Sequence, residues 1–124
     1  MTSQQRKARL RNKADKVLQE TCRLLYKKCL ICGGEYSCGH HFYPKSTAAS
    51  LRYNLKNIIP ICIKCHCRIH SSDDPSLNLR IIELKGQEWI EELKIIKRNT
   101  FIKDTIEYYE TVINNLEKIK PYKV

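Results

Sequence analysis

Apolar residues recur with a helical period over the first part of the chain. They recur at helical spacing, at Leu10, Ala14, Val17, Leu18 and Leu25, and basic residues cover much of the remaining surface. Such spacing places the apolar side chains on one face of a helix. The pattern predicts a helix over residues 4–27, with the hydroxyl of Ser3 as its N-cap.

The pattern changes between residues 29 and 75. The segment "NIIPIC" (57–62) is short, apolar and rich in β-branched residues, which predicts a strand. Pro60 has no N–H group, so this strand is not expected inside an uninterrupted ladder. The residues from Ile63 to His70 predict a short helix that ends at "SSDDP".

The remaining residues again have a helical period. The segment "SLNLRIIELK" predicts a helix that ends at Gly86, and the last helix is expected to stop before Pro121. Two apolar stripes line the later helices: Trp89, Ile90, Leu93 and Ile96, then Ile102, Ile106, Tyr109, Ile113 and Leu116. A stripe of this kind is typical of a core or of a partner surface, so the C-terminal helices are also a candidate homodimer surface.

These elements predict a single domain of a mostly helical α+β class. It has a basic N-terminal helix (1–28), a middle core (29–75) and C-terminal helices (76–124). A chain of 124 residues buries a modest core, which a bound metal would help to stabilise. The chain has no run of 18 apolar residues and no secretory h-region, so we expect a cytoplasmic protein without a membrane span.

Seven cysteines without an export signal favour metal binding over disulfides. Four of them form two C-x2-C pairs: Cys29, Cys32, Cys62 and Cys65. Four thiolates satisfy a closed, tetrahedral structural Zn²⁺ site. The alternative is four ordinary buried cysteines, which the double spacing disfavours. Cys22 is expected on a helix face, whereas Cys38 and Cys67 flank the pairs and are competing ligands.

All four histidines lie between residues 40 and 70. His66 and His70 are four residues apart, which places them on one face of a helix. Neighbouring residues of a strand point to opposite faces, so His40 and His41 have different roles. We expect His40, His66 and His70 to bind a catalytic metal, His41 to act as general base, and Asn57 to orient an imidazole. Structural histidines, or Cys38–His40 and Cys67–His70 as extra zinc ligands, are the alternatives.

The net charge of +10 is unevenly distributed. Residues 1–28 carry nine Lys and Arg against two acidic residues, a net of +7, while residues 29–75 carry +2 and residues 76–124 carry +1. A basic arm on a nearly neutral body favours a polyanion, most often a nucleic acid, over a merely solvated helix face. The basic residues of the arm are Arg6, Lys7, Arg9, Arg11, Lys13 and Lys16.

The segments "HHFYP" and "NIIPICIKCH" together resemble the HNH, or ββα-metal, nuclease motif in its four-cysteine form. Over roughly residues 5–98 the chain is also similar to the NinG/Rap recombination nucleases of lambdoid phages. The resemblance implies a ββα-metal core that carries an endonuclease site for DNA, with branched or structured DNA as a candidate substrate. It assigns His41 as general base, Asn57 as orienting residue, and His40, His66 and His70 as ligands of a cation such as Mg²⁺ or Mn²⁺.

In a nuclease of this kind, Lys45, Arg52 and Lys56 would flank the scissile phosphate, because they lie between the histidine pair and Asn57. A different class of function is a non-catalytic, zinc-stabilised DNA-binding module, which needs the cysteines and the basic arm but not the histidines. A protein–protein adaptor is a third class, and it explains neither the charge nor the histidine pair.

Overall fold

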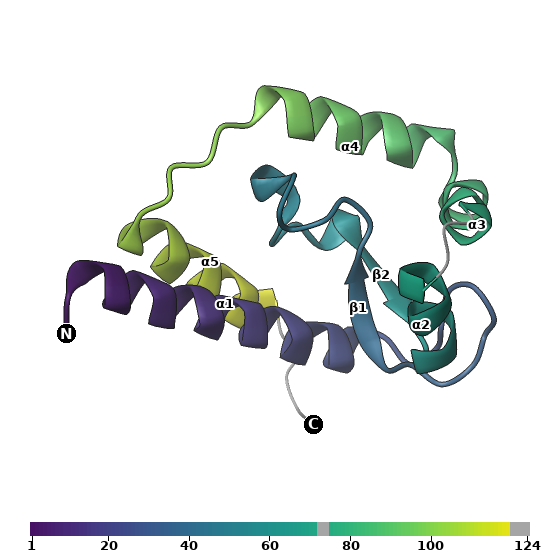
Figure 1. The fold of residues 1–124 in the computed structure, drawn as a ribbon, viewed down its shortest axis with the longest axis horizontal. Coiled ribbons are helices and arrows are strands. Elements are labelled where there is room, and N and C mark those ends of the chain that lie inside the picture. The colour runs from purple at the N-terminus through teal and green to yellow at the C-terminus, as the bar shows by residue number, and fades with distance from the viewer. Residues whose placement is uncertain (72–74, 120–124) are drawn as a thin grey trace.

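The computed structural model describes residues 1–71 and 75–119. In these residues the protein has an α+β fold that is mainly helical, as predicted. The strands and helices are α1 (Ser3–Leu25), β1 (Cys38–His41), β2 (Ile58–Ile61), α2 (Ile63–Ser71), α3 (Ser76–Lys85), α4 (Gln87–Asn99) and α5 (Ile106–Ile119), with 3₁₀ turns at Ala49–Leu51 and Leu55–Asn57. Helices α1 and α4 lie on either side of the two-stranded sheet and the loop that joins its strands (Figure 1).

Helix α1 and its N-cap each begin one residue earlier than predicted. Thr2, not Ser3, is the N-cap, because Thr2 and Gln5 form a reciprocal capping box. The Gln5 amide N–H donates to Thr2 Oγ1 at 3.1 Å, and the Thr2 amide N–H donates to Gln5 Oε1 at 2.9 Å. Ser3 is the first residue of the helix. The helix ends at Leu25, two residues before its predicted end.

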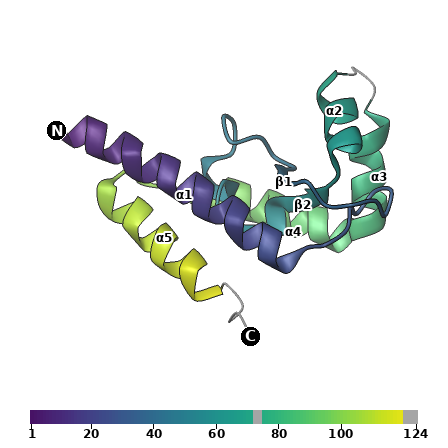
Figure 2. The same cartoon turned by 90° about the horizontal axis from the view of Figure 1, so that it is seen from below.

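Helix α5 packs lengthwise beside α1, and the two run in the same general direction (Figures 1 and 2). Their apolar faces form the main core with one residue of the sheet: Ala14, Val17, Leu18, Cys22, Ile58, Tyr109, Ile113 and Leu116. The stripe on α5 is therefore core, and a homodimer through the C-terminal helices would need another surface.

Cys22 lies on the buried face of α1. Ile102 precedes α5, and the predicted stop before Pro121 lies outside the described residues.

Strand β1 pairs with β2 in an antiparallel register that sets Gly39 opposite Pro60 and His40 opposite Ile59. The strand predicted over residues 57–62 is shorter because Asn57 ends a 3₁₀ turn and Cys62 follows the last paired residue. Each strand of a two-stranded sheet is an edge strand, and an edge strand tolerates a proline. The Pro60 carbonyl accepts a hydrogen bond from the Leu30 N–H at 2.9 Å, so β2 also holds the segment after α1.

Gln19 of α1 binds the backbone of β1 with both ends of its side-chain amide. The Gly39 N–H donates to Gln19 Oε1 at 2.9 Å, and Gln19 Nε2 donates to the Gly39 carbonyl at 3.0 Å. A side chain at position 39 would collide with the core, since a Cβ there lies 2.6 Å from Ile58 Cγ2 and 3.1 Å from Cys22 Sγ. Glycine thus allows the basic helix to lie directly against the strand that carries the histidine pair.

Helix α4 covers the long loop between the strands. Its predicted face is confirmed: Ile90 and Leu93 are buried, and Trp89 and Ile96 pack around Leu51. Trp89 also donates its indole N–H to the Lys56 carbonyl at 2.7 Å. The loop of residues 42–57 is therefore held between α1 and α4. No helix within the described ranges is long and apolar enough to cross a membrane.

The Gln19 clamp can be tested by replacing Gln19 with Ala. A net hydrogen bond contributes about 0.5–1.5 kcal/mol, so loss of both should lower the free energy of unfolding by about 1–3 kcal/mol in urea denaturation. Gln87→Ala is the matched control, because Gln87 is exposed and bonds only Glu91 on its own helix. Equal effects of the two substitutions would contradict a clamp role for Gln19.

Candidate metal centre

The two C-x2-C pairs come together as a single cluster. The sulfur atoms of Cys29, Cys32, Cys62 and Cys65 all lie within 4.8 Å of one another. Cys29 and Cys32 stand in the turn after α1, where Gly33 adopts a positive φ of 74°, and the other pair spans the end of β2 and the first turn of α2. This arrangement is compatible with a structural metal such as zinc.

Backbone N–H groups point at the sulfur atoms of this cluster. The Gly34 N–H lies 3.4 Å from Cys32 Sγ, and the Cys65 N–H lies 3.4 Å from Cys62 Sγ. The second contact lowers the pKa of Cys62 to about 7, whereas burial and the neighbouring thiols raise the pKa of Cys65. Donors aimed at sulfur stabilise thiolates, the form in which cysteine binds a metal.

Three of the four histidines form a second cluster. His40 comes from β1, and His66 and His70 come from one face of α2, with the Nε2 atoms of His66 and His70 3.0 Å apart. The ring of His40 lies 5.4 Å from that of His66 and 5.5 Å from that of His70, centre to centre. Their ring nitrogens lie within 4.8 Å of one another, so the three can serve as ligands of one ion.

The surroundings favour neutral imidazoles at two histidines of this cluster, His40 and His66. Burial, followed by the charges of His66 and His70, lowers the pKa of His40 to about 4. Burial, then His70, lowers the pKa of His66. His40 is 7% exposed, while His70 is exposed. The cluster is therefore buried at His40 and open to solvent at His70, and the lowered pKa values of His40 and His66 favour the uncharged nitrogens that bind metals.

His41 lies on the other face of β1, and a backbone carbonyl holds its ring. Its Nε2 is 2.8 Å from the Arg52 carbonyl oxygen. Since a carbonyl only accepts hydrogen bonds, Nε2 carries the proton and Nδ1 is left as the basic nitrogen. Burial lowers the pKa of His41, and the hydrogen bond to Arg52 opposes that effect. His41 is thus neutral at pH 7, as a general base must be.

Asn57 has a different set of partners from the one expected. Its side chain is fully buried. Its Oδ1 accepts from the Tyr43 N–H at 2.8 Å, and its Nδ2 donates to the carbonyls of Tyr43 and Leu51 at 3.1 and 3.3 Å. Asn57 thus fixes the loop that carries Arg52, and the Arg52 carbonyl makes the contact with His41. Sequence reasoning missed that carbonyl because every residue has one.

A cavity of about 670 Å³ is lined by all four residues of β1. All four histidines line it, and its polar wall includes Gln19, Lys45, Ser46 and Asn78. Lys45 is thus one of the residues at the cavity. Arg52 and Lys56 are not among its lining residues, and each is paired with an acidic residue of a flanking helix. Arg52 makes a two-pronged bond to Asp15 of α1, at 3.0 and 2.6 Å, and Lys56 pairs with Glu92 of α4.

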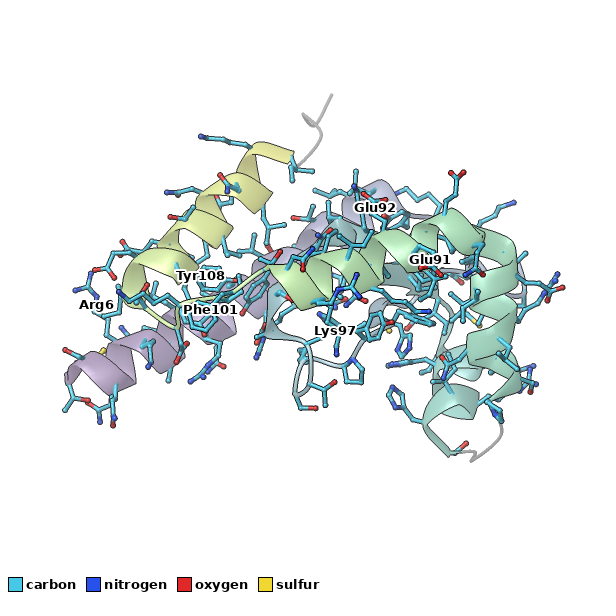
Figure 3. The ribbon with its side chains drawn as sticks, turned by 90° about the horizontal axis from the view of Figure 1, so that it is seen from above. Arg6, Glu91, Glu92, Lys97, Phe101 and Tyr108 are labelled. Carbon is cyan, nitrogen blue, oxygen red and sulfur yellow. The ribbon has the colours of Figure 1, made fainter. Side chains whose placement is uncertain are left out.

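The six basic residues that were predicted for the arm divide into two groups. Lys7 forms an ion pair with Asp104 at 3.0 Å, and Arg11 is half-buried beside Tyr53. The other four are exposed at spacings of three, four and three residues, which places them on one face: Arg6, Arg9, Lys13 and Lys16. We call these four the basic stripe. It runs from Arg6, far from α2 in Figure 3, to Lys16, one turn before the cavity residue Gln19.

Two cysteines lie beside the clusters without belonging to either. Cys38 is half-buried, and its Sγ is 3.4 Å from Nδ1 of His66. Cys67 is exposed on α2. The zinc ligand pairs Cys38–His40 and Cys67–His70 are therefore not the groupings that the fold forms among the described residues.

Comparisons with protein-family models, with curated proteins and with solved structures give no match for this chain. The resemblance to HNH nucleases therefore remains an expectation from the motif residues. The two clusters, the cavity and the basic stripe are the features from which a function can be inferred.

The cysteine cluster predicts that zinc content and stability change together. Cys29→Ser should lower the zinc-to-protein ratio and the thermal midpoint, because binding to a structural site adds directly to folding free energy. Elemental analysis and calorimetry measure the two quantities. Cys67→Ser is the control, since this exposed thiol is outside the cluster, and it should keep both values. Full zinc content in the Cys29 variant would contradict the ligand assignment.

Proposed function

We propose that this protein is a metal-dependent DNA endonuclease of the HNH type, with β1, β2 and α2 as its ββα-metal core. One observation carries the proposal. His40 of β1 meets His66 and His70 of α2, while the adjacent His41 lines the same cavity and its bond to the Arg52 carbonyl leaves Nδ1 as the basic nitrogen. A set of metal ligands next to an unprotonated base is the arrangement that hydrolysis of a phosphodiester requires.

His40, His66 and His70 would hold the cation, which when bound supplies positive charge to the scissile phosphate and the departing 3′ oxygen. His41 takes a proton from the attacking water at Nδ1, and the Arg52 carbonyl stabilises the imidazolium that forms. Asn57 keeps that carbonyl in place through the loop. Imidazole nitrogen suits first-row transition ions better than Mg²⁺, so Mn²⁺ should support faster cleavage than Mg²⁺.

The basic stripe provides the DNA-binding surface in this proposal. Arg6, Arg9, Lys13 and Lys16 are exposed along one face that leads toward the cavity, and Lys45 continues positive charge into the cavity wall. Lys and Arg contacts to phosphates position a protein on DNA without reading its sequence. The substrate class that fits is therefore DNA recognised by its backbone, including branched recombination intermediates.

A non-catalytic, zinc-stabilised DNA-binding module is the second candidate, since the cysteine cluster and the basic stripe would be sufficient for it. Incubation of supercoiled plasmid with Mn²⁺ or Mg²⁺ distinguishes the two functions. Nicking that depends on the cation and on His40 supports the nuclease. Binding without nicking supports the module.

His41→Ala should reduce plasmid nicking by about 10²–10⁴-fold, the usual effect of losing a general base. The variant should keep its zinc, its cation binding and its affinity for DNA, because His41 belongs to neither metal cluster. His40→Ala is the matched comparison on the same strand and should lose cation binding as well as nicking. Wild-type nicking by pure His41→Ala protein would rule out His41 as the base.

Neutralising the basic stripe should weaken DNA binding and reduce its salt dependence. Each phosphate contact adds about 0.9 to the slope of log K against log salt. Changing the four stripe residues to Gln should therefore reduce the slope by up to about 3.6 in fluorescence anisotropy titrations. The control removes the same charge from other helices, at Lys85, Lys94, Arg98 and Lys118, and should leave the slope near wild type. Equal slopes for all three proteins would exclude the stripe.

A further inference from the structure

Cys38 connects the cysteine cluster to the histidine cluster. It is the first residue of β1, pairs with Ile61 of β2, and packs against the buried group that contains Cys62 and Cys65. Its sulfur lies 3.4 Å from Nδ1 of His66, the residue that directly follows Cys65. The Cys38 thiol thus packs against residues of the cysteine cluster and lies beside a residue of the histidine cluster.

The two nitrogens of His66 face different neighbours. Nε2 is 3.0 Å from Nε2 of His70, inside the histidine cluster, and Nδ1 faces Cys38. A neutral imidazole has one N–H donor and one lone pair. If Nδ1 holds the proton and donates it to Cys38 Sγ, the lone pair of Nε2 is directed toward His70 and is free for a cation. The opposite tautomer would place a proton inside the cluster and block binding there.

We propose that Cys38 is the positioning residue of the histidine cluster, accepting a hydrogen bond from His66 Nδ1–H and so fixing both the tautomer and the ring orientation of that ligand. Metal-binding histidines commonly donate their second N–H to a carboxylate or a carbonyl. Here a thiol sulfur takes that place. The inference rests on the cation site of the proposed function, but it does not depend on cleavage of DNA.

The backbone of His66 supports the same geometry. Its N–H donates to the Cys62 carbonyl at 3.0 Å, within the turn that carries the second C-x2-C pair. The main chain of His66 is thus held by the cysteine cluster, and its ring is held by Cys38. A histidine whose main chain and ring are both held in place loses little conformational freedom when it binds an ion, which favours affinity.

Cation affinity without DNA provides the first test. Zinc-loaded protein is titrated with Mn²⁺ at fixed pH by calorimetry. Cys38→Ala should weaken binding by about 10–100-fold, the usual effect of losing such a partner. Cys38→Ser retains an acceptor and should recover most of the affinity. Cys67→Ala, a change at an exposed cysteine beside His66, should bind like wild type.

The tautomer of His66 provides a second test that needs no variant. ¹⁵N NMR of the zinc-loaded protein without added Mn²⁺ should show the proton on Nδ1 in the wild type, and Cys38→Ala should lose this preference. A proton on Nε2 in the wild type, or unchanged affinity in Cys38→Ala, would overturn the inference. So would a sulfur-to-cobalt charge-transfer band from Co²⁺ in the histidine cluster that disappears in Cys38→Ala, because Cys38 would then be a direct ligand.

These outcomes also separate the inference from the proposed function. If the wild-type protein, like His40→Ala, binds neither Mn²⁺ nor Co²⁺, the inference and the proposed function are both contradicted. Mn²⁺ binding that is lost in His40→Ala but unchanged in Cys38→Ala contradicts the inference alone.

Discussion

The antiparallel pairing of β1 with β2 determines where every residue of the candidate site lies. Its register sets Cys38 opposite Ile61 and His40 opposite Ile59. Because α2 follows β2 after one residue, the same pairing brings His40 to His66 and His70. A slip of one residue would exchange the faces of β1 and turn His41 toward α2. The cysteine cluster resists such a slip, since its two pairs hold both ends of this region together.

Two helices hold the site from opposite sides, and they do so by polar contacts as much as by packing. Helix α1 binds β1 through Gln19 and the loop through Asp15, while α4 binds the loop through Trp89 and Glu92. Two of these contacts are ion pairs, in which Arg52 and Lys56 connect the loop to α1 and α4. The loop is consequently fixed, and with it the Arg52 carbonyl that orients His41.

The two clusters differ in the way expected for two different roles. The cysteine cluster has four soft ligands, which suits a closed structural site. The histidine cluster brings three imidazoles together beside a cavity, and its His70 is exposed. Burial keeps His40 neutral, and the adjacent His41 is kept neutral by burial on the other face of the strand. In the proposed function, the ligand His40 and the base His41 can be neighbours in sequence because the pleat points their side chains to opposite faces.

Features that depend on neighbours in the chain could be predicted from the sequence. The sequence pattern located α1, α2 and α3 closely, the C-x2-C spacing indicated the cysteine cluster, and the four-residue spacing of His66 and His70 indicated a shared face. These are local properties, since a helix or a metal-binding turn relates residues a few positions apart. Even for α1 the predicted cap was wrong. Thr2 is the cap and not Ser3, because Thr2 stands three residues before Gln5 and the two side chains form a reciprocal capping box.

Contacts between distant segments were decided only by the tertiary structure. The partners of Asn57, Arg52 and Lys56 lie on elements that packing brings together, and many acidic or backbone groups would satisfy each side chain equally well. Cys38 is the clearest case. As a residue in the sequence it had several candidate roles, and only the pairing of β1 with β2 and the position of α2 set its sulfur beside His66. The sequence determined which chemical groups are available, and the fold determined which of them meet.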